Sequence, residues 1–180
     1  MKNILSFVFE IIKISLIAIA IVVPIRYFLF QPFFVRGESM DPNFENGDYL
    51  IIDEISYRFK DVGRGEVIVF ISPVDSSQRF IKRVIGLPGE TVKIEEGRVL
   101  IYTSTGEKVL DESEYLYGVE TMGNTKVILG TDEYFVMGDN RPFSFDSRRF
   151  GPVKEDNIIG KVALRAWPFG SMTTFEAPVY

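Results

Sequence analysis

The apolar segment at the start of the chain constrains its fold more than any other feature. Between Ile4 and Ile25 the sequence carries only two charged residues, Glu10 and Lys13. A stretch of this length is long enough for a helix to cross the apolar part of a bilayer. The two charges lie three positions apart, so on a helix they can face each other or reach the same interface. We therefore expect residues 1–30 to form a single-pass membrane anchor and residues 31–180 to form the folded domain.

A cleaved signal peptide is the alternative interpretation of this segment. Ala18-Ile19-Ala20 offers the small-x-small pattern of a cleavage site. The apolar run continues past this site, however, whereas a cleavage site follows the end of the run. Basic residues lie on both sides of the segment, so the distribution of positive charge does not assign an orientation.

The rest of the chain alternates short β-type runs with turn residues. The runs are DYLIIDEISYRF, GEVIVFISP, QRFIKRVIG, the hairpin TVKIEEGRVLIYTSTGEKV around residues 95–97, EYFVMGDN and NIIGKVALRAW. β-Branched and aromatic residues separated by glycine and proline turns are typical of strands. The pattern predicts a mainly β fold, a barrel-like antiparallel domain. Residues 96–130 are more polar and weakly periodic, and we expect them to form a smaller inserted β subdomain.

The chain has no histidine and no cysteine, which removes several classes of chemistry. It cannot form a disulfide framework, a thiolate or imidazole metal site, or a Ser-His-Asp triad. Any general base must be a carboxylate, a lysine, a tyrosine or a metal-bound water. Of the 25 acidic residues only Glu10 precedes Gly37. The domain is therefore acidic and lacks the basic patch that nucleic-acid binding calls for.

The stretch VRGESMDP, residues 35–42, places Ser39 in a turn just beyond the apolar segment. Turns routinely contain Gly, Ser, Asp and Pro, so an ordinary turn serine is the simpler interpretation. The stretch is not the Gly-x-Ser-x-Gly elbow of the hydrolases, since residue 41 is Asp. Its position makes Ser39 a candidate nucleophile that would act close to a membrane surface.

Lys82 is the candidate base for such a nucleophile. On a strand RFIKRVIG it shares a face with Phe80 and Val84. Apolar surroundings disfavour the ammonium form, so the amine can be neutral and accept a proton. Arg83 lies in an equally apolar pattern on the other face, but a guanidinium does not deprotonate. The alternative is a lysine on an edge strand that discourages aggregation.

A third cluster lies in GDNRPFSFDSRRFGP, for which an ordinary loop is the alternative interpretation. Ser144, Asp146 and Arg148 alternate in it, so an extended backbone would place them on one face. An Asp-Arg pair beside a hydroxyl can hold and orient an amine. A metal site is not expected, because the neighbouring arginines would repel a cation.

Three of these motifs, in this order behind an apolar N-terminal segment, resemble the type I signal peptidases of bacteria: GESMDP, RFIKRVIGLPGE and GDNRPFSFDSRRFGPV. GEVIVFISP and IIGKVALRAWPFG are similar to intervening and closing strands of that family. The resemblance covers most of the chain and is weakest across residues 96–130. It implies a serine endopeptidase anchored in the cell membrane, with the catalytic domain on the extracytoplasmic side. Such an enzyme removes signal peptides from exported preproteins after small residues at positions −1 and −3.

The resemblance also implies roles for individual residues by their motif positions. Ser39 would be the nucleophile and Lys82 the general base. Ser144 would hydrogen-bond and orient the Lys82 amine, while Asp146 and Arg148 would form a supporting ion pair.

The oxyanion would be held by the Ser39 backbone amide and a group at Gly37. Some members carry a serine at the latter position, so the identity of the second donor in this chain is open. This chain also departs from the family at Asn43 and Phe44, where Thr-Leu is common, and at Glu90, where Asp is common. The residues around shallow apolar pockets for the −1 and −3 side chains would be Phe33, Val35, Met40, Phe44, Phe80 and Ile81.

We expect a monomer without metal or cofactor, whose partners are preprotein signal peptides and the lipid bilayer. Two other functions compete with this one. A cytosolic Ser-Lys autoprotease of the repressor-cleaving kind is disfavoured by the apolar segment and by the lack of a DNA-binding region before the dyad. A non-catalytic, membrane-tethered β-domain that binds peptides is disfavoured by the presence of both Ser39 and Lys82.

Overall fold

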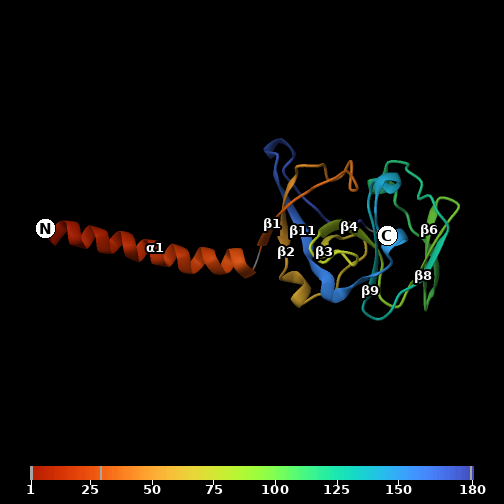
Figure 1. The fold of residues 1–180 in the computed structure, drawn as a ribbon, viewed down its shortest axis with the longest axis horizontal. Helices are drawn as coiled ribbons and strands as arrows, with labels where there is room; N and C mark the ends of the chain where they lie inside the picture. The colour runs from red at the N-terminus through yellow and green to blue at the C-terminus, as the bar shows by residue number, and fades with distance from the viewer. Residues whose placement is uncertain (1, 29, 179) are drawn as a thin grey trace.

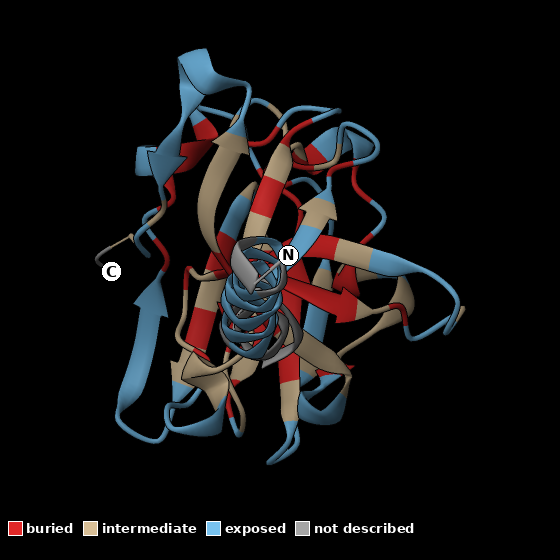
Figure 2. Cartoon of the chain, turned by 90° about the vertical axis from the view of Figure 1, so that its left-hand side faces the viewer, coloured by how far each residue is buried: buried red, intermediate tan, exposed pale blue. Residues whose placement is uncertain are grey.

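The computed structural model describes residues 2–28, 30–178 and 180, and contains one long helix and two antiparallel sheets (Figure 1). The helix, α1 (Lys2–Phe28), extends away from the β-rich body. Apolar residues on it are exposed, among them Ile4, Phe9 and Ile14. Figure 2 shows this helix in front of the strands, coloured mainly as exposed. None of the described helices combines the length and apolarity that crossing a membrane needs. The helical conformation of the segment is confirmed, and the single-pass anchor stays a prediction.

The larger sheet has eight strands in the order β1-β2-β11-β3-β4-β9-β10, with β12 beside β11. Its strands are β1 (Phe30–Phe34), β2 (Tyr49–Asp53), β3 (Val67–Ile71), β4 (Arg79–Gly86), β9 (Glu133–Met137), β10 (Val153–Lys154), β11 (Ile158–Trp167) and β12 (Thr173–Thr174). Every pairing is antiparallel, which confirms the mainly β, antiparallel fold. Among the described strands β1 and β10 each pair with one neighbour, so hydrogen bonds do not close this sheet into a full barrel.

The smaller sheet has the strand order β7-β6-β5-β8, and three of its four strands lie within residues 96–130, for which a smaller subdomain is predicted. Its strands are β5 (Thr91–Glu95), β6 (Arg98–Thr103), β7 (Gly106–Val109) and β8 (Thr125–Ile128). The subdomain therefore begins before residue 96, because β5 belongs to it. The predicted β5–β6 hairpin is present, and its turn residues Glu96 and Gly97 have φ of 50° and 76°. Positive φ at both central residues is what a two-residue hairpin turn of type I′ requires.

The remaining elements are short helical turns. They are α2 (Ser113–Leu116), α3 (Ser147–Phe150), η1 (Ser56–Arg58), η2 (Arg141–Phe143), η3 (Glu155–Asn157) and η4 (Phe169–Ser171). The short α2 lies in the connection between β7 and β8, and η2 and α3 follow β9.

Alternation along β4 distributes its side chains among three apolar cores. Ile81 packs into a core beneath the β1–β2 connection, and Ile85 packs into a second core that joins the two sheets. Phe80 and Val84 belong to a third core on the other face of the strand. Because β4 pairs with β3 along most of its length and with β9 only from Arg83 onward, its first half keeps one open edge among the described strands.

Candidate active site

The turn that carries Ser39 follows β1 closely and is held by contacts with two other segments. Gly37 has φ +90°, a conformation that glycine adopts readily, and its N–H donates to Asn46 Oδ1 at 3.0 Å. From the loop after β9, the Asn140 N–H donates to the Ser39 carbonyl at 3.1 Å. The Asn140 side chain also donates to the Glu38 carbonyl at 2.9 Å. Ser39 is thus fixed between two loops, and its side chain is partly accessible.

Lys82 reaches this turn from β4. Its Nζ lies 2.7 Å from Ser39 Oγ and 2.8 Å from the Ile81 carbonyl, within hydrogen-bond distance of both. Lys82 is only 4% exposed, and its Nζ lies 5.6 Å from the centre of the Phe80 ring. The lysine therefore lies on the face of the strand that it shares with Phe80, as predicted. Lys82 does not act as a solvent-exposed lysine that discourages aggregation at a sheet edge, because the residue is buried and its amine contacts Ser39.

The environment of Lys82 prepares its amine to accept a proton. Burial lowers the pKa of Lys82 to about 8, although Asp146 and Asp139 act in the opposite direction. Burial disfavours the ammonium form, and the neutral form carries a free lone pair. At mildly alkaline pH the amine can therefore take the proton of the adjacent Ser39 hydroxyl.

Asp146 and Arg148 form the predicted ion pair. Arg148 Nε and Nη2 donate to the two carboxylate oxygens of Asp146, each at 2.8 Å, and Gly138 N–H donates to Asp146 Oδ2 at 3.1 Å. Asp146 is fully buried, and burial alone would raise its pKa. The hydrogen bonds and the charge of Arg148 outweigh burial, so the pKa of Asp146 lies below its ordinary value.

Ser144 lies close to the site without making the predicted hydrogen bond to Lys82. Within the described residues its Oγ is buried and makes no hydrogen bond of good geometry, although the hydroxyl helps lower the pKa of Asp146. The same region packs tightly around Gly138. A Cβ there would lie 2.2 Å from the Ser39 carbonyl oxygen and 2.3 Å from Ser144 Oγ. The close approach of Gly138 to Ser39 has no local signature in the sequence.

A cleft of about 470 Å³ opens beside the Ser39–Lys82 pair. Three of the predicted pocket residues line it, namely Phe33, Phe80 and Ile81. Its other lining residues are Pro32, Phe34, Arg36, Gly37, Glu38, Ser39, Arg79, Lys82, Phe143 and Phe145. A smaller hollow of about 240 Å³ shares Phe33 and Arg79 and extends toward Ile52 and Val69. The cleft is therefore an aromatic trough with two arginines in its walls.

Three predicted pocket residues lie elsewhere. Val35, Met40 and Phe44 are buried in the core beneath the Ser39 turn and do not line the cleft. Phe143 and Phe145 line it instead. They lie directly before and after Ser144 in the third motif, and this position next to a candidate site residue was the one feature of the sequence that could have predicted them as cleft residues.

The two expected oxyanion donors differ in their availability. Within the described residues the Ser39 N–H has no hydrogen-bond acceptor, so it is available to donate to a ligand. The Gly37 N–H is already paired with Asn46 Oδ1. The amide of Gly37 would have to exchange that partner before it could bind an oxyanion.

Other hollows and acidic groups lie apart from this pair. A polar hollow of about 350 Å³ between β11 and the C-terminal segment contains neither Ser39 nor Lys82. Among the described residues no group of three or more acidic side chains is arranged to hold a metal ion.

A family model and relatives with similar sequences agree on one family. The model of the family described as signal peptidase, peptidase S26, matches residues 8–167. A probable signal peptidase I-2 of Synechocystis is 36% identical over 88% of this chain and 73% of that protein. The signal peptidase I V of Bacillus subtilis is 34% identical over 83% of this chain and 93% of that protein. A solved signal peptidase I from Enterococcus faecalis is 34% identical, with a TM-score of 0.49 over 57% of this chain and 97% of that chain.

Proposed function

This chain belongs to the signal peptidase family, peptidase S26, and from that premise we propose that it removes N-terminal signal peptides from exported preproteins by a Ser-Lys mechanism. The resemblance of its three motifs to type I signal peptidases is confirmed by the family match. The observation that carries the mechanism is the hydrogen-bond distance of 2.7 Å between Lys82 Nζ and Ser39 Oγ in a buried environment.

The reaction begins with neutral Lys82 as the general base. As Ser39 Oγ attacks the carbonyl carbon of the scissile bond, its proton passes to Lys82 Nζ and a tetrahedral oxyanion forms. The free Ser39 N–H donates to this oxyanion. The Lys82 ammonium then gives its proton to the leaving amine as the C–N bond breaks, which leaves an acyl-enzyme. Lys82 next removes a proton from water as the water oxygen attacks the acyl carbon. The Lys82 ammonium then returns that proton to Ser39 Oγ as the acyl C–O bond breaks, which releases the product acid and regenerates Ser39 and the neutral amine.

The third motif supports this pair. The Asp146–Arg148 ion pair and the Gly138 N–H bond to Asp146 fix the loop internally, and Asn140 in the same loop bonds to the Ser39 turn. We assign Ser144 the role of orienting the Lys82 amine once substrate excludes water from the cleft.

The substrate would bind as an extended peptide along the open edge of β4, beside Lys82. Strand addition supplies main-chain hydrogen bonds, and alternate side chains enter pockets. Phe33, Phe80 and Ile81 line the cleft, and their bulk would favour small substrate side chains over larger ones. Small residues at −1 and −3 would satisfy both requirements.

We also propose that α1 anchors the chain in the cell membrane as a single-pass segment, with the catalytic domain on the extracytoplasmic side. The exposed apolar side chains of α1 support membrane association, and β1 follows the helix after one residue. Protease treatment of inside-out and right-side-out vesicles tests the orientation, because the domain should be digested only in right-side-out vesicles. Digestion only in inside-out vesicles would reverse it.

Cleavage of a preprotein in detergent or liposomes tests the proposed function. Wild type should release the mature protein, and Ser39→Ala should release none, because the nucleophile is lost. Ser104→Ala, on an exposed turn of the smaller sheet, is the matched control and should behave as wild type. Equal processing by wild type and Ser39→Ala would overturn the assignment and leave the non-catalytic peptide-binding domain as the better interpretation.

A further inference from the structure

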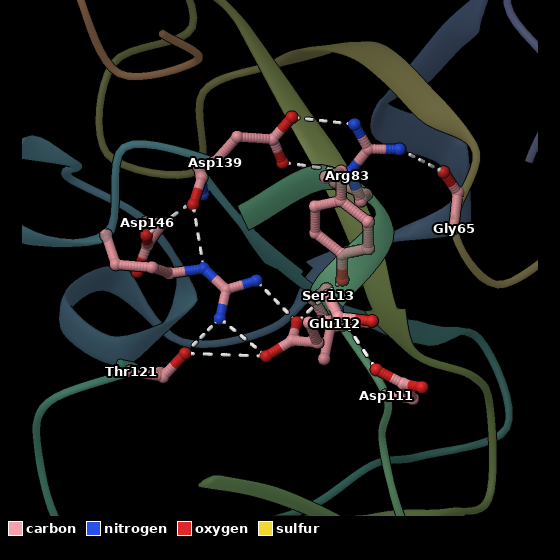
Figure 3. A network of polar contacts seen from close by, with 12 residues as sticks. Gly65, Arg83, Asp111, Glu112, Ser113, Thr121, Asp139 and Asp146 are labelled. Carbon is pink, nitrogen blue, oxygen red and sulfur yellow. Dashed lines mark hydrogen bonds and ion pairs between the residues drawn. The ribbon is translucent and has the colours of Figure 1, made fainter. Parts of the chain in front are cut away.

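The loop after β9 is tied to the smaller subdomain by one buried arginine. Arg141 is only 2% exposed, and its Nε donates to the Gly138 carbonyl at 3.0 Å. Its two terminal nitrogens donate to the two carboxylate oxygens of Glu112 at 2.9 and 2.5 Å, and one of them also contacts the Thr121 hydroxyl. Figure 3 draws these contacts, with Glu112 and Thr121 on one side of the network and Asp139 and Asp146 on the other.

The groups that hold this guanidinium come from outside the catalytic motifs. Glu112 and Thr121 both lie in the connection between β7 and β8, on the subdomain side, and both are buried. Tyr115, in α2 of the same connection, donates its hydroxyl to Glu112 at 2.6 Å. A bidentate arginine–carboxylate pair fixes direction as well as distance. The connection therefore presents a preorganised carboxylate to Arg141.

The other side of Arg141 faces the reacting groups through the backbone. Gly138, whose carbonyl accepts from Arg141, packs against the Ser39 carbonyl so closely that a Cβ would collide with it. The Gly138 N–H donates to Asp146, and the Arg141 carbonyl accepts from Arg148 at 2.7 Å. A displacement of Arg141 would thus shift the backbone on which Ser39 and Asp146 depend.

We propose that Glu112 is a positioning residue for the peptidase reaction. Glu112 holds Arg141 in place, and Arg141 in turn keeps residues 138–146 packed against Ser39 and Lys82. The inference rests on the proposed function, and it makes the smaller subdomain part of the catalytic apparatus. The carboxylate at position 112 has to be charged, because the Arg141 guanidinium is buried and removal of one partner leaves an uncompensated charge.

Glu112→Gln tests the proposal with the size of the side chain preserved. We expect kcat to fall by about ten- to a hundredfold and KM to stay within about twofold, because geometry rather than substrate contact is lost. The alkaline rise in activity should also move to lower pH, since Asp146 and Asp139 raise the pKa of Lys82 and would move away from it. Glu114→Gln, an exposed change in α2, is the control and should match wild type in both measurements.

These measurements distinguish a positioning role of Glu112 from a role in stability alone. They also distinguish failure of this proposal from failure of the proposed function. A Glu112→Gln enzyme with a lowered Tm but with wild-type kcat and pH profile per folded molecule would overturn it. If that variant does not fold, Thr121→Val removes one neutral contact to Arg141 and should lower kcat by about two- to tenfold. Wild-type kcat in Thr121→Val would then overturn it. Preprotein cleavage by wild type and its loss in Ser39→Ala are measured first, so failure there concerns the proposed function only.

Discussion

The buried amine of Lys82 has the Ser39 hydroxyl and the Ile81 carbonyl as its hydrogen-bond partners. This environment determines the pH range in which Lys82 can act as a base. Burial lowers its pKa from the ordinary lysine value to about 8. Arg83, the next residue, points to the other face of β4 and donates to Asp139 at 2.8 and 2.6 Å. These adjacent basic residues therefore have different roles. Lys82 has no directly bonded carboxylate and can lose its proton, whereas Arg83 stays charged and forms an ion pair with Asp139.

The pH dependence of activity should follow the deprotonation of Lys82. Because the base must be neutral, kcat/KM should rise with pH through about 8 and fall about tenfold per unit below it. Initial rates of preprotein cleavage across mildly acidic to alkaline pH measure this, with Tm recorded at each pH to show that the enzyme is folded. Lys82→Arg should be inactive at every pH, since a guanidinium keeps its proton. A flat profile, or activity in Lys82→Arg, would assign the base to another group.

At the scale of elements, the end of β9 and the turn after β1 are packed so closely that only glycine fits between them. Gly138 continues from β9 and touches the Ser39 backbone, and Asn43 on the same side donates to both Asp139 and the Tyr115 carbonyl at 2.9 Å. The departure from the family at Asn43 therefore serves as a link between the nucleophile segment, the β9 loop and α2.

Gly138→Ala should lower both activity and stability. The added Cβ would meet two oxygen atoms at distances that no real Cβ contact reaches, so the Ser39 turn or the β9 loop must move. We expect kcat to fall by about a hundredfold and the free energy of unfolding by about 1–3 kcal/mol, measured by initial rates and by urea denaturation. Gly170→Ala is the control, because no atom lies within 4 Å of a Cβ there. Wild-type activity in Gly138→Ala would contradict the close packing.

At the scale of the whole molecule, the cleft lies beside the residues that follow α1, the most apolar element of the chain. The two sheets that support it are packed against each other. The core that joins the sheets includes Ile85, Phe135 and Met137 from the larger sheet and Val92 and Ile94 from the smaller. The smaller sheet is therefore packed onto the catalytic sheet by apolar contacts as well as by the Glu112–Arg141 pair.

The apolar side chains of α1 should bind the chain to lipid bilayers. Full-length protein should float with liposomes in a density gradient, and a variant that lacks residues 2–28 should not. Flotation should persist at high salt, because apolar burial is not screened as surface charge is. Full-length protein that stays at the bottom of the gradient would contradict membrane association.

Local features of the sequence determined the elements of this protein and the type of chemistry open to it. Period-two alternation placed Lys82 on one face with Phe80 and Val84, because that pattern needs only neighbouring residues. The residues around Gly97 predicted the hairpin for the same reason. The lack of histidine restricted the general base before any contact was known.

The tertiary structure alone decided which side chains meet across long stretches of chain. It buried Val35 and Met40 in a core and brought Phe143 to the cleft, although all three are apolar in sequence. It also paired Glu112, in the connection between β7 and β8, with Arg141, in the turn η2 after β9. Such pairings depend on how distant strands pack and on which polar groups must be satisfied once buried, and no periodicity within a short segment encodes either of them.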